Sequence, residues 1–286
     1  MQLWLYLPEP GIDPGQLAEL AVAAERAGFD GLALMDHLVT PVAEDRPVLE
    51  SMALAAWLAA RTDTLRLGHL VLCDAMRHPA VLAKAAVTID HLSGGRFELG
   101  LGWGSWAPEL VGFDITRDRP AQRVARLEHS LAVITALWAG EPAVDDGKRQ
   151  VPLPLRRIPI LVGGAGPRTL ALAREYADWW NLPAPDVDRL DELRPQAGAA
   201  RSSVQLAVKL VDDAADADAA RQRIVQRMGD FGAGLVVGGP AAVATRIDEL
   251  TAAGVERIYL WPLGRLQPTD IENLSVSARG RSTPND

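Results

Sequence analysis

Three side chains near two predicted strand ends have the chemistry for proton transfer. Asp36 and His37 follow the apolar run 31–34, and Glu9 follows the apolar run 3–7. A histidine exchanges protons near neutral pH, and an adjacent carboxylate can orient the imidazole or accept a hydrogen bond from a ligand. An Asp-His pair also serves as a turn or cap, and Glu9 fits a solvated loop as well as an active-site acid. We predict that His37, Asp36 and Glu9 are the catalytic residues.

A glycine-rich segment offers a second kind of site, for a phosphate group. Residues 163–167 read Gly-Gly-Ala-Gly-Pro and lie between an apolar run and a predicted helix. The unpaired N–H groups and the dipole at a helix N-terminus attract anions, and the side chains of Arg168 and Thr169 add donors. Tight packing of a turn would produce the same glycines. The segment 238–240, Gly-Gly-Pro, has the same form and fits a plain turn, unless it adds a second wall to the anion site.

Tryptophans close to glycines indicate a third site, for a flat ligand. The chain is only 5% aromatic, yet Trp103 and Trp106 lie beside glycines in the segment that follows the apolar run 97–101. Glycine lets the backbone approach a ligand closely, and indole rings stack on planar groups. Core packing is the alternative for Trp179, since adjacent residues on a strand point in opposite directions. We predict substrate contacts by Ser105, Trp106 and Trp179.

Strands and helices alternate along the chain and must position these residues. The predicted strands are residues 3–7, 31–34, 65–72, 97–101, 158–162, 178–182, 204–211 and 255–261. Each is apolar on both faces, as are the strands of a parallel sheet covered by helices. Eight such strands predict an α/β fold, the closed (β/α)8 TIM barrel, whose active site lies over the carboxyl ends of the strands. The alternative is an open doubly wound sheet, but Pro-Glu-Pro-Gly at 8–11 lacks the glycine fingerprint of its first turn.

Length and composition limit the kinds of partner. The 286 residues fit one barrel domain over 1–274, followed by a tail over 275–286 that we expect to be disordered. A net charge of −8 with scattered basic residues predicts no nucleic-acid or membrane partner. Cys73 is the single cysteine and no histidines have metal-ligand spacing, so we predict neither a disulfide nor a metal site. The lack of a signal peptide and of a long apolar run predicts a cytoplasmic protein.

Several motifs stand at separate positions along the chain. They are Gly28-Phe29-Asp30-Gly31 before Asp36-His37, Arg77-His78-Pro79 at a helix start, Thr88-Ile89-Asp90-His91-Leu92-Ser93-Gly94-Gly95-Arg96, Leu99-Gly100-Leu101-Gly102, and Gly163 to Thr169. Together, over about residues 1–265, they resemble the bacterial luciferase-like flavin and deazaflavin oxidoreductases. The segment 88–96 is specific for this family but not for one reaction. We expect residues 90–96 to be architectural and residues 102–105 to contact a ligand.

The resemblance implies a barrel that binds FMN or coenzyme F420, an 8-hydroxy-5-deazaflavin, with the ring over the barrel mouth. The glycine segment favours F420, and FMN is the alternative. The family places a non-prolyl cis peptide where this chain has Leu70–Val71, forming a bulge behind the ring. Many members are homodimers, for which the second and third helices offer apolar faces. The predicted cofactor-binding residues are Asp36, Leu70, Val71, Gly102, Trp103, Gly104, Gly163, Gly164, Gly166, Arg168 and Thr169.

We therefore predict an oxidoreductase that moves a hydride between reduced F420 and a small organic substrate, with His37 exchanging the proton. One alternative is an FMN-dependent monooxygenase that uses separately supplied reduced flavin and oxygen. Another is a barrel that binds a flavin without catalysis. Ser105 stands where the sugar-phosphate dehydrogenases of the family carry a catalytic glutamate, which argues against that substrate class.

Overall fold

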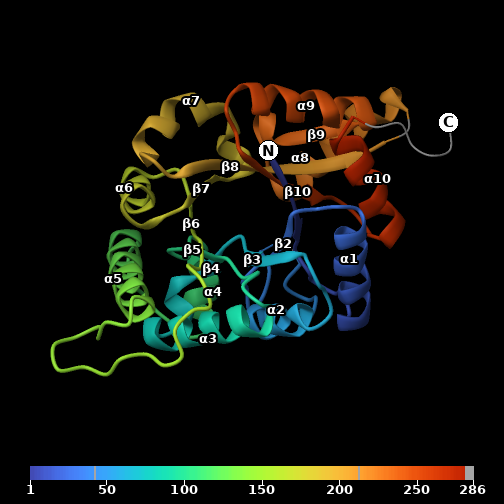
Figure 1. Ribbon diagram of the computed structural model, residues 1–286. Helices are drawn as coiled ribbons and strands as arrows, with labels where there is room; N and C mark the ends of the chain where they lie inside the picture. The colour runs from blue at the N-terminus through green and yellow to red at the C-terminus, as the bar shows by residue number, and fades with distance from the viewer. Residues whose placement is uncertain (42, 212, 281–286) are drawn as a thin grey trace.

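Parallel strands form a closed ring in the computed structural model, which describes residues 1–41, 43–211 and 213–280 (Figure 1). Hydrogen bonds connect the strands in the order β3-β2-β1-β10-β8-β7-β6-β5-β4, and a bridge between Leu67 and Phe97 joins β3 to the residues just before β5. Because β3 and β4 are two halves of one interrupted strand, this bridge closes the ring. The predicted (β/α)8 barrel is confirmed. The strands are β1 Gln2–Leu7, β2 Gly31–Leu34, β3 Arg66–His69, β4 Leu72–Cys73, β5 Leu99–Gly102, β6 Ile160–Gly163, β7 Trp179–Leu182, β8 Arg201–Leu210, β9 Leu235–Gly238 and β10 Arg257–Pro262.

Helices surround the ring (Figure 1). Proline stands in the first turn of many of them, where its missing N–H leaves no helical hydrogen bond unmade. Asp13 caps α1 by accepting a hydrogen bond from the Gln16 N–H at 3.1 Å. Within the described ranges, no helix is both long and apolar enough to cross a membrane. The helices are α1 Pro14–Arg26, α2 Ser51–Ala59, α3 Pro79–Leu92, α4 Ala107–Gly112, α5 Pro120–Trp138, α6 Pro167–Tyr176, α7 Leu190–Leu193, α8 Ala214–Met228, α9 Pro240–Ala252 and α10 Pro268–Ala278.

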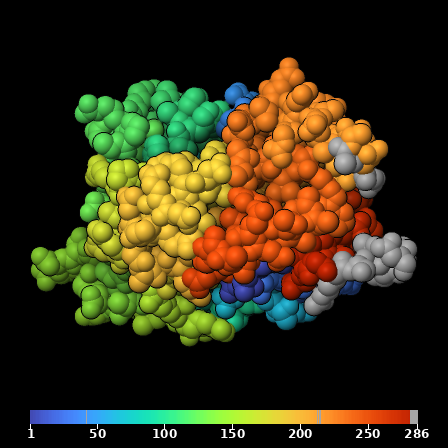
Figure 2. Space-filling model, turned by 90° about the horizontal axis from the view of Figure 1, so that it is seen from above, coloured from blue at the N-terminus to red at the C-terminus, as the bar shows by residue number. Residues whose placement is uncertain are grey.

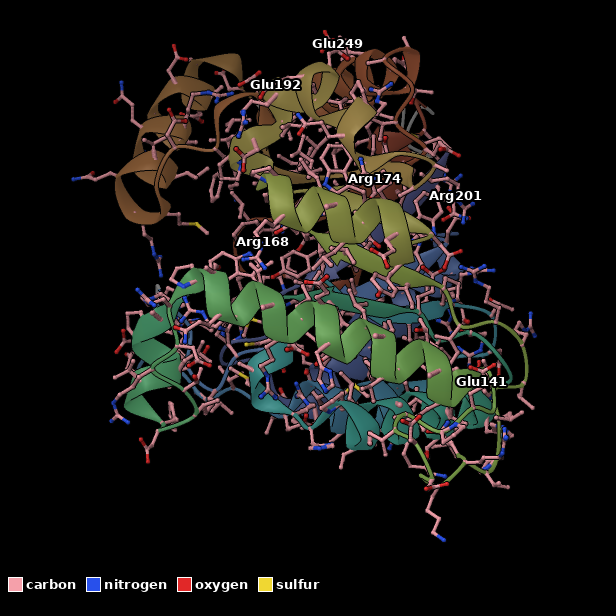
Figure 3. All side chains as sticks on the ribbon, turned by 90° about the vertical axis from the view of Figure 1, so that its left-hand side faces the viewer. Glu141, Arg168, Arg174, Glu192, Arg201 and Glu249 are labelled. Atoms are coloured by element: carbon pink, nitrogen blue, oxygen red, sulfur yellow. The ribbon has the colours of Figure 1, made fainter. Side chains whose placement is uncertain are left out.

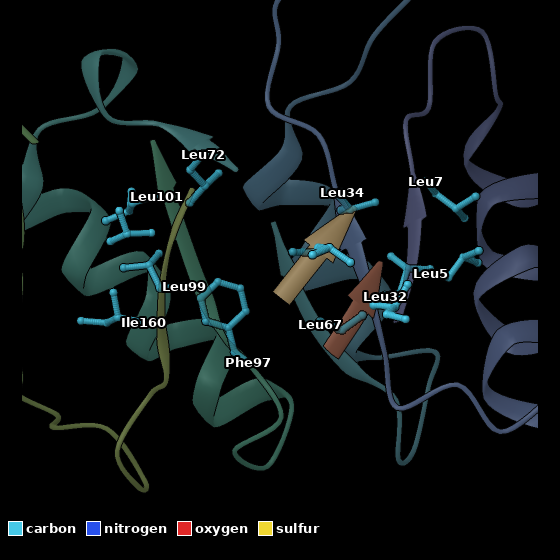
Figure 4. Packing of buried hydrophobic residues seen from close by; sticks show 14 of the residues in the cluster. Leu5, Leu7, Leu32, Leu34, Leu67, Leu72, Phe97, Leu99, Leu101 and Ile160 are labelled. Carbon is cyan, nitrogen blue, oxygen red and sulfur yellow. The ribbon is translucent and has the colours of Figure 1, made fainter. Parts of the chain in front are cut away.

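Alternate residues of the strands build two separate cores. Leu5 and Leu7 of β1 point outward toward α1 (Figure 4), within the large cluster that joins strands to helices. Trp4 and Tyr259 lie on the opposite row, which faces the barrel axis, and both are almost fully buried. The barrel therefore has a packed interior and leaves only its ends for a ligand.

A buried ion pair fills the amino-terminal end of the barrel. Arg257 donates to both carboxylate oxygens of Glu98 at 2.7 and 3.1 Å. The same guanidinium lies between two indole rings, 4.3 Å from the centroid of Trp4 and 3.7 Å from that of Trp179. Removing either partner would leave the other charge buried without a counter-charge. Since charged and aromatic groups block this end, a ligand must enter at the carboxyl ends of the strands.

Two expectations about the last third of the chain are wrong. The short strand β9 was not predicted, because three apolar residues between glycines give a weak pattern; it pairs with residues 207–210 of β8. The tail expected from residue 275 begins instead as the last turn of α10, where the hydroxyl of Ser275 donates to the carbonyl of Ala27 at 2.7 Å. Residues 281–286 of that expected tail lie outside the described residues.

The segment 90–96 holds neighbouring elements together, in agreement with its expected architectural role. The guanidinium of Arg96 donates to the backbone carbonyls of Ala59, Thr62 and Leu65 at 2.9, 2.7 and 2.6 Å. The carboxylate of Asp90 accepts a hydrogen bond at 2.8 Å from the N–H of Leu155. Leu155 belongs to the connection between α5 and β6, which projects from the body of the protein (Figures 1 and 2).

Replacing Arg96 should therefore lower stability. Arg96→Ala leaves three carbonyls at the end of α2 and in the following turn without their donor, and we expect the free energy of unfolding to fall by about 2–3 kcal/mol. Urea unfolding measures this loss. Arg117→Ala is the matched control, because its guanidinium is exposed and, among the residues that the structure describes, pairs only with the exposed Asp114. Equal stability losses in the two variants would show that Arg96 is dispensable.

Candidate active site at the barrel mouth

Asp36 is the most strongly held carboxylate at the barrel mouth. Its Oδ1 accepts hydrogen bonds from the Ser51 hydroxyl at 2.7 Å and from Arg77 Nη2 at 2.8 Å. Its Oδ2 accepts from the Cys73 N–H at 2.8 Å and from Arg77 Nη1 at 2.6 Å. Burial opposes ionisation of this group, but the guanidinium and the other donors outweigh burial and keep the pKa of Asp36 below its usual value.

These contacts contradict the predicted role of Asp36. Four donors occupy the lone pairs of its carboxylate, so no acceptor site is left for a proton, a cofactor ring or the imidazole of His37. Asp36 acts instead as a connector, because its partners belong to the start of α2, to β4 and to the turn before α3. Sequence reasoning misplaced it because adjacency to His37 along the chain says nothing about where a side chain points.

The partner of His37 is Glu109, a residue that sequence reasoning missed. His37 Nδ1 lies 3.0 Å from Oε2 of Glu109, while Oε1 of the same buried carboxylate accepts hydrogen bonds from the N–H groups of Leu38 and Val39 at 2.5 and 3.1 Å. Since this carboxylate acts as an acceptor for its other donors, we assign the proton to Nδ1. In the neutral ring the other nitrogen, Nε2, then carries no proton, and the His37 side chain is 30% exposed.

Glu109 comes from the long connection between β5 and α5. That connection was expected to be functional because it is longer than most, and it contains the short helix α4. Glu109 lies 72 residues from His37 in sequence, and the connection also carries Asp114 and Asp118, so spacing could not identify the partner. The only available signal was the place of the residue in this long segment.

Glu9 lies buried beyond the end of β1. It is 2% exposed, and neither carboxylate oxygen has a hydrogen-bond partner among the described residues. Burial, with a smaller contribution from the negative Asp36, raises the pKa of Glu9 to about 8. The carboxyl group is therefore mostly protonated at neutral pH and can donate a hydrogen bond. Its burial rules out the solvated-loop interpretation.

The predicted bulge is present between β3 and β4. The peptide bond between Leu70 and Val71 is cis. The side chain of Val71 fills the space beside two glycines, because a β-carbon would lie 2.6 Å from it at Gly102 and 3.1 Å at Gly163. At Gly100 the carbonyl oxygen of His69, 2.0 Å away, leaves no room for a β-carbon. Gly102 and Gly163 are thus required by the packing of Val71, which lies next to the aromatic and aliphatic cluster along the barrel axis.

The glycine segment after β6 leaves the start of α6 open. Gly164 is fixed to β7, because its N–H donates to the carbonyl of Asn181 at 3.0 Å and its carbonyl accepts from Trp180 Nε1 at 2.8 Å. Gly166 is the N-cap of α6 and provides no side-chain cap. The buried Thr169 packs against Gly164, and the guanidinium of Arg168 reaches the carbonyl of Ala121 at 3.1 Å. The first N–H groups of α6 therefore suit an anion.

The aromatic residues at the mouth differ in part from the prediction. Trp106 lies edge-on to His37 with ring centroids 6.0 Å apart, and Ser105 beside it is exposed. Trp179 was predicted to contact substrate, and this is wrong: it is the first residue of β7, 1% exposed, and it stacks on Arg257 at the closed end. Trp261, near the carboxyl end of β10, lies at the mouth between Tyr6 and Phe231.

Two further points concern the predicted ligand set. Trp103 was expected to touch the cofactor, but its ring packs against the helix-facing core and against Arg123. Gly104 follows it with a φ of +75°, a conformation that favours glycine. Within the described ranges, no three His, Cys, Asp or Glu side chains gather in a way that could hold a metal ion.

Comparison with known proteins places this barrel among enzymes. An F420-dependent glucose-6-phosphate dehydrogenase of Nakamurella multipartita is 32% identical over 210 residues, which cover 70% of this chain and 61% of that protein. A putative coenzyme F420-dependent oxidoreductase of Mycobacterium tuberculosis is 35% identical over 205 residues, which cover 63% of this chain and 54% of that protein. The chain thus spans between half and two thirds of the length of these relatives.

Solved structures confirm the fold. An F420-dependent secondary alcohol dehydrogenase in complex with an F420-acetone adduct superposes with a TM-score of 0.79 at 17% identity, over 97% of this chain and 99% of that one. The coenzyme F420 dependent tetrahydromethanopterin reductase of Methanopyrus kandleri gives a TM-score of 0.77 at 19% identity, over 98% of each chain. The model of the luciferase-like monooxygenase family matches residues 2–211, and the chain therefore belongs to that family.

Proposed function

We propose that this protein is an oxidoreductase that uses coenzyme F420 and transfers a hydride between the deazaflavin and a small organic substrate. The observation that carries the proposal is the pairing of His37 with Glu109 at the barrel mouth, in the region that also holds the buried Glu9. The names of the related proteins support F420 as the coenzyme. Hydride transfer is the chemistry that the coenzyme would supply when bound.

The residues at the mouth fit such a group. Val71, which packs beside Gly102 and Gly163, offers an apolar surface for a flat ring. The uncapped start of α6 offers N–H donors for a phosphate. Glu9 has a buried carboxyl group whose oxygens find no partner in the described chain, and a polar ring edge or substrate oxygen would satisfy it. Leu70, Gly102, Gly163, Gly164, Arg168 and Thr169 remain predicted contacts of the cofactor.

His37 would move the proton that accompanies the hydride. While the Nδ1–H group donates a hydrogen bond to Glu109, Nε2 can take a proton from a substrate hydroxyl during oxidation or return it to a carbonyl oxygen during reduction. The carboxylate of Glu109 fixes the ring and stabilises the imidazolium that forms. Glu9, protonated at neutral pH, would donate a hydrogen bond without adding negative charge.

A fluorescence titration tests the identity of the cofactor. We expect F420 to quench the fluorescence of the protein's tryptophans at concentrations where FMN has little effect, because the similar proteins are named as F420-dependent enzymes. FMN-dependent monooxygenation is the competing function, since monooxygenases share this fold. Tight binding of FMN without a response to F420 would favour that function and overturn ours.

Removal of the His37 imidazole should lower the rate of turnover far more than it weakens the binding of F420. For His37→Ala we expect the rate of coenzyme reoxidation by small aldehydes and ketones to fall roughly 10²-fold or more, with an almost unchanged F420 dissociation constant. Glu109→Gln should also lower the rate and shift its pH profile, because the amide no longer stabilises a protonated ring. His91→Ala, an exposed histidine away from the mouth, is the control. A fully active His37→Ala enzyme would exclude His37 from proton transfer.

The raised pKa of Glu9 predicts a pH-dependent cost to stability. The unfolded chain ionises this carboxyl near pH 4.5, whereas the folded protein holds its proton up to about pH 8. Unfolding therefore becomes easier by up to about 1.4 kcal/mol per pH unit between these values, and the cost is complete above pH 8. Glu9→Gln removes this pH dependence of the unfolding free energy. The variant should therefore gain stability over the ligand-free wild type as pH rises from 5 to 8. Denaturant unfolding at several pH values measures the difference, and a constant difference would contradict a buried, protonated Glu9.

A further inference from the structure

Lys209, near the end of β8, is a cation that the site described so far does not use. The helix-facing core takes its side chains from every second position of this strand, namely Val204, Leu206 and Val208. Because side chains alternate along a strand, Lys209 belongs to the opposite row, which faces the barrel axis. The residue is half-buried, and its ammonium group forms no ion pair with another residue in the described part of the chain.

The start of β8 confirms this direction. Arg201 is paired with Trp179 of β7, and its guanidinium lies 3.8 Å from the centroid of that axis-facing ring. Figure 3 shows Arg201 at the end of the barrel opposite Arg168, which lies at the start of α6. Lys209 follows Arg201 by an even number of positions, so it lies in the same row, toward the mouth.

The sheet register gives the height of Lys209 in the barrel. The Leu263 N–H donates to a carbonyl of β8 at 2.8 Å, which extends the pairing of β10 with β8 and places Leu263 level with Lys209. The registers of β10 with β1 and of β1 with β2 continue this level to positions 8 and 35. Those positions immediately precede the two acidic residues Glu9 and Asp36. Lys209 therefore lies in the layer where the barrel opens.

Gly264 leaves room for the ammonium group at the edge of the mouth. A β-carbon at this position would lie 3.3 Å from Lys209 Nζ, so a side chain there would crowd the cation. The φ of Gly264 is +127°, a conformation that favours glycine. The ammonium group thus lies against bare backbone after β10.

Four neighbouring strands connect this cation to the proton-transfer groups. Their order in the sheet is β2-β1-β10-β8, and their carboxyl ends carry in turn His37, Glu9, Trp261 and Lys209. The ring of Trp261 lies edge-on to Tyr6 with centroids 5.8 Å apart, so an aromatic surface separates the acid from the cation. Three strand spacings amount to about 14 Å along the rim, and the side chains at both ends shorten this gap to the length of a small carbon chain.

We propose that Lys209 binds a carboxylate at the end of the substrate remote from the reacting carbon, so that the substrates are oxo acids and the matching hydroxy acids. The assignment rests on the proposed function for the reaction. In the reductive direction the carbonyl carbon gains a hydride from reduced F420 and its oxygen gains a proton, while F420 is oxidised. One ammonium group balances the single charge of a carboxylate, whereas a phosphate ester carries about −1.5 to −2 at neutral pH.

A purely structural role for Lys209 makes a different prediction. A lysine can bury its carbon chain along an apolar surface and leave its ammonium group in water. Its replacement would then lower stability or affect charged and uncharged substrates alike. The informative comparison is between ketones that have the same spacer and differ only in the terminal group. Such ketones are 5-oxohexanoate, 2-hexanone, (4-oxopentyl)trimethylammonium and 4-oxopentyl phosphate.

The experiment measures kcat and KM for these ketones, with reduced F420 as the hydride donor, in the wild type, Lys209→Met, Lys209→Glu and Lys148→Met. Lys148→Met is the control, because it removes an exposed lysine from the connection between α5 and β6. We expect the wild type and the control to prefer 5-oxohexanoate over 2-hexanone by about 10-fold or more in kcat/KM. Lys209→Met should lose this preference through a higher KM, with 2-hexanone within about 2-fold of wild type. Lys209→Glu should prefer the trimethylammonium ketone.

A second readout needs no coenzyme. Thermal unfolding is measured in 5-oxohexanoate and in chloride of equal ionic strength. The oxo acid should raise the melting temperature of the wild type and of Lys148→Met, and it should not raise that of Lys209→Met.

Each outcome separates the two proposals. If the wild type binds F420 but shows no preference for 5-oxohexanoate, or if Lys209→Met keeps the preference, the role of Lys209 is overturned and F420 binding stands. A preference for the phosphate ester would overturn the carboxylate assignment. If the wild type neither binds F420 nor reduces any ketone, the proposed function fails, and the melting temperatures still decide whether Lys209 binds a carboxylate. If Lys209→Met does not fold, Lys209→Arg and Lys209→Gln replace it, and only Lys209→Arg should keep the preference.

Discussion

The site depends most on the carboxylate of Asp36 and its ion pair with Arg77. This single buried group joins the end of β2 to the start of α2 through Ser51 and to β4 through the N–H of Cys73. Those contacts fix the chain just before His37 and after the bulge at Val71. The position of the imidazole and the shape of the surface beneath a bound ring are therefore set by a residue that takes no part in the chemistry.

A second constraint is the closed amino-terminal end of the barrel. Arg257 and Glu98 neutralise each other between tryptophan rings, and the hydroxyl of Tyr259 accepts a further hydrogen bond from Arg257 at 2.9 Å. Such a pair is satisfied internally and needs no ligand. The buried carboxyl group of Glu9, which has no hydrogen-bond partner among the described residues, lies at the other end. The closed end thus holds a paired charge, and the open end holds an unpaired acid.

The sequence was informative wherever a property is local. Apolar runs predicted the eight barrel strands, and glycines predicted the turn at 93–95 and the opening before α6, because each depends on backbone preferences of a few neighbouring residues. His37 was found because it directly follows a strand end. The resemblance to a family supplied the cis bond at Leu70–Val71, which no local pattern indicates.

What could not be predicted depends on contacts between distant residues. Glu109 reaches His37 across 72 positions, and the four donors to Asp36 come from three separate segments. Trp179 was predicted to lie at the barrel mouth, but it lies at the closed end. Alternation along a strand shows which side chains face the barrel axis, but it does not show how far along that axis each one lies. The strand β9 pairs only with β8, and its pattern is too short to stand out.

The most direct test of this account is a crystal structure of the protein with F420 bound. We expect the deazaflavin ring to lie against Val71 with His37 and Glu9 at its reactive side, while the Asp36–Arg77 ion pair remains intact. A ring that contacts the carboxylate of Asp36 after Arg77 has moved away, or a coenzyme bound elsewhere than the barrel mouth, would contradict it.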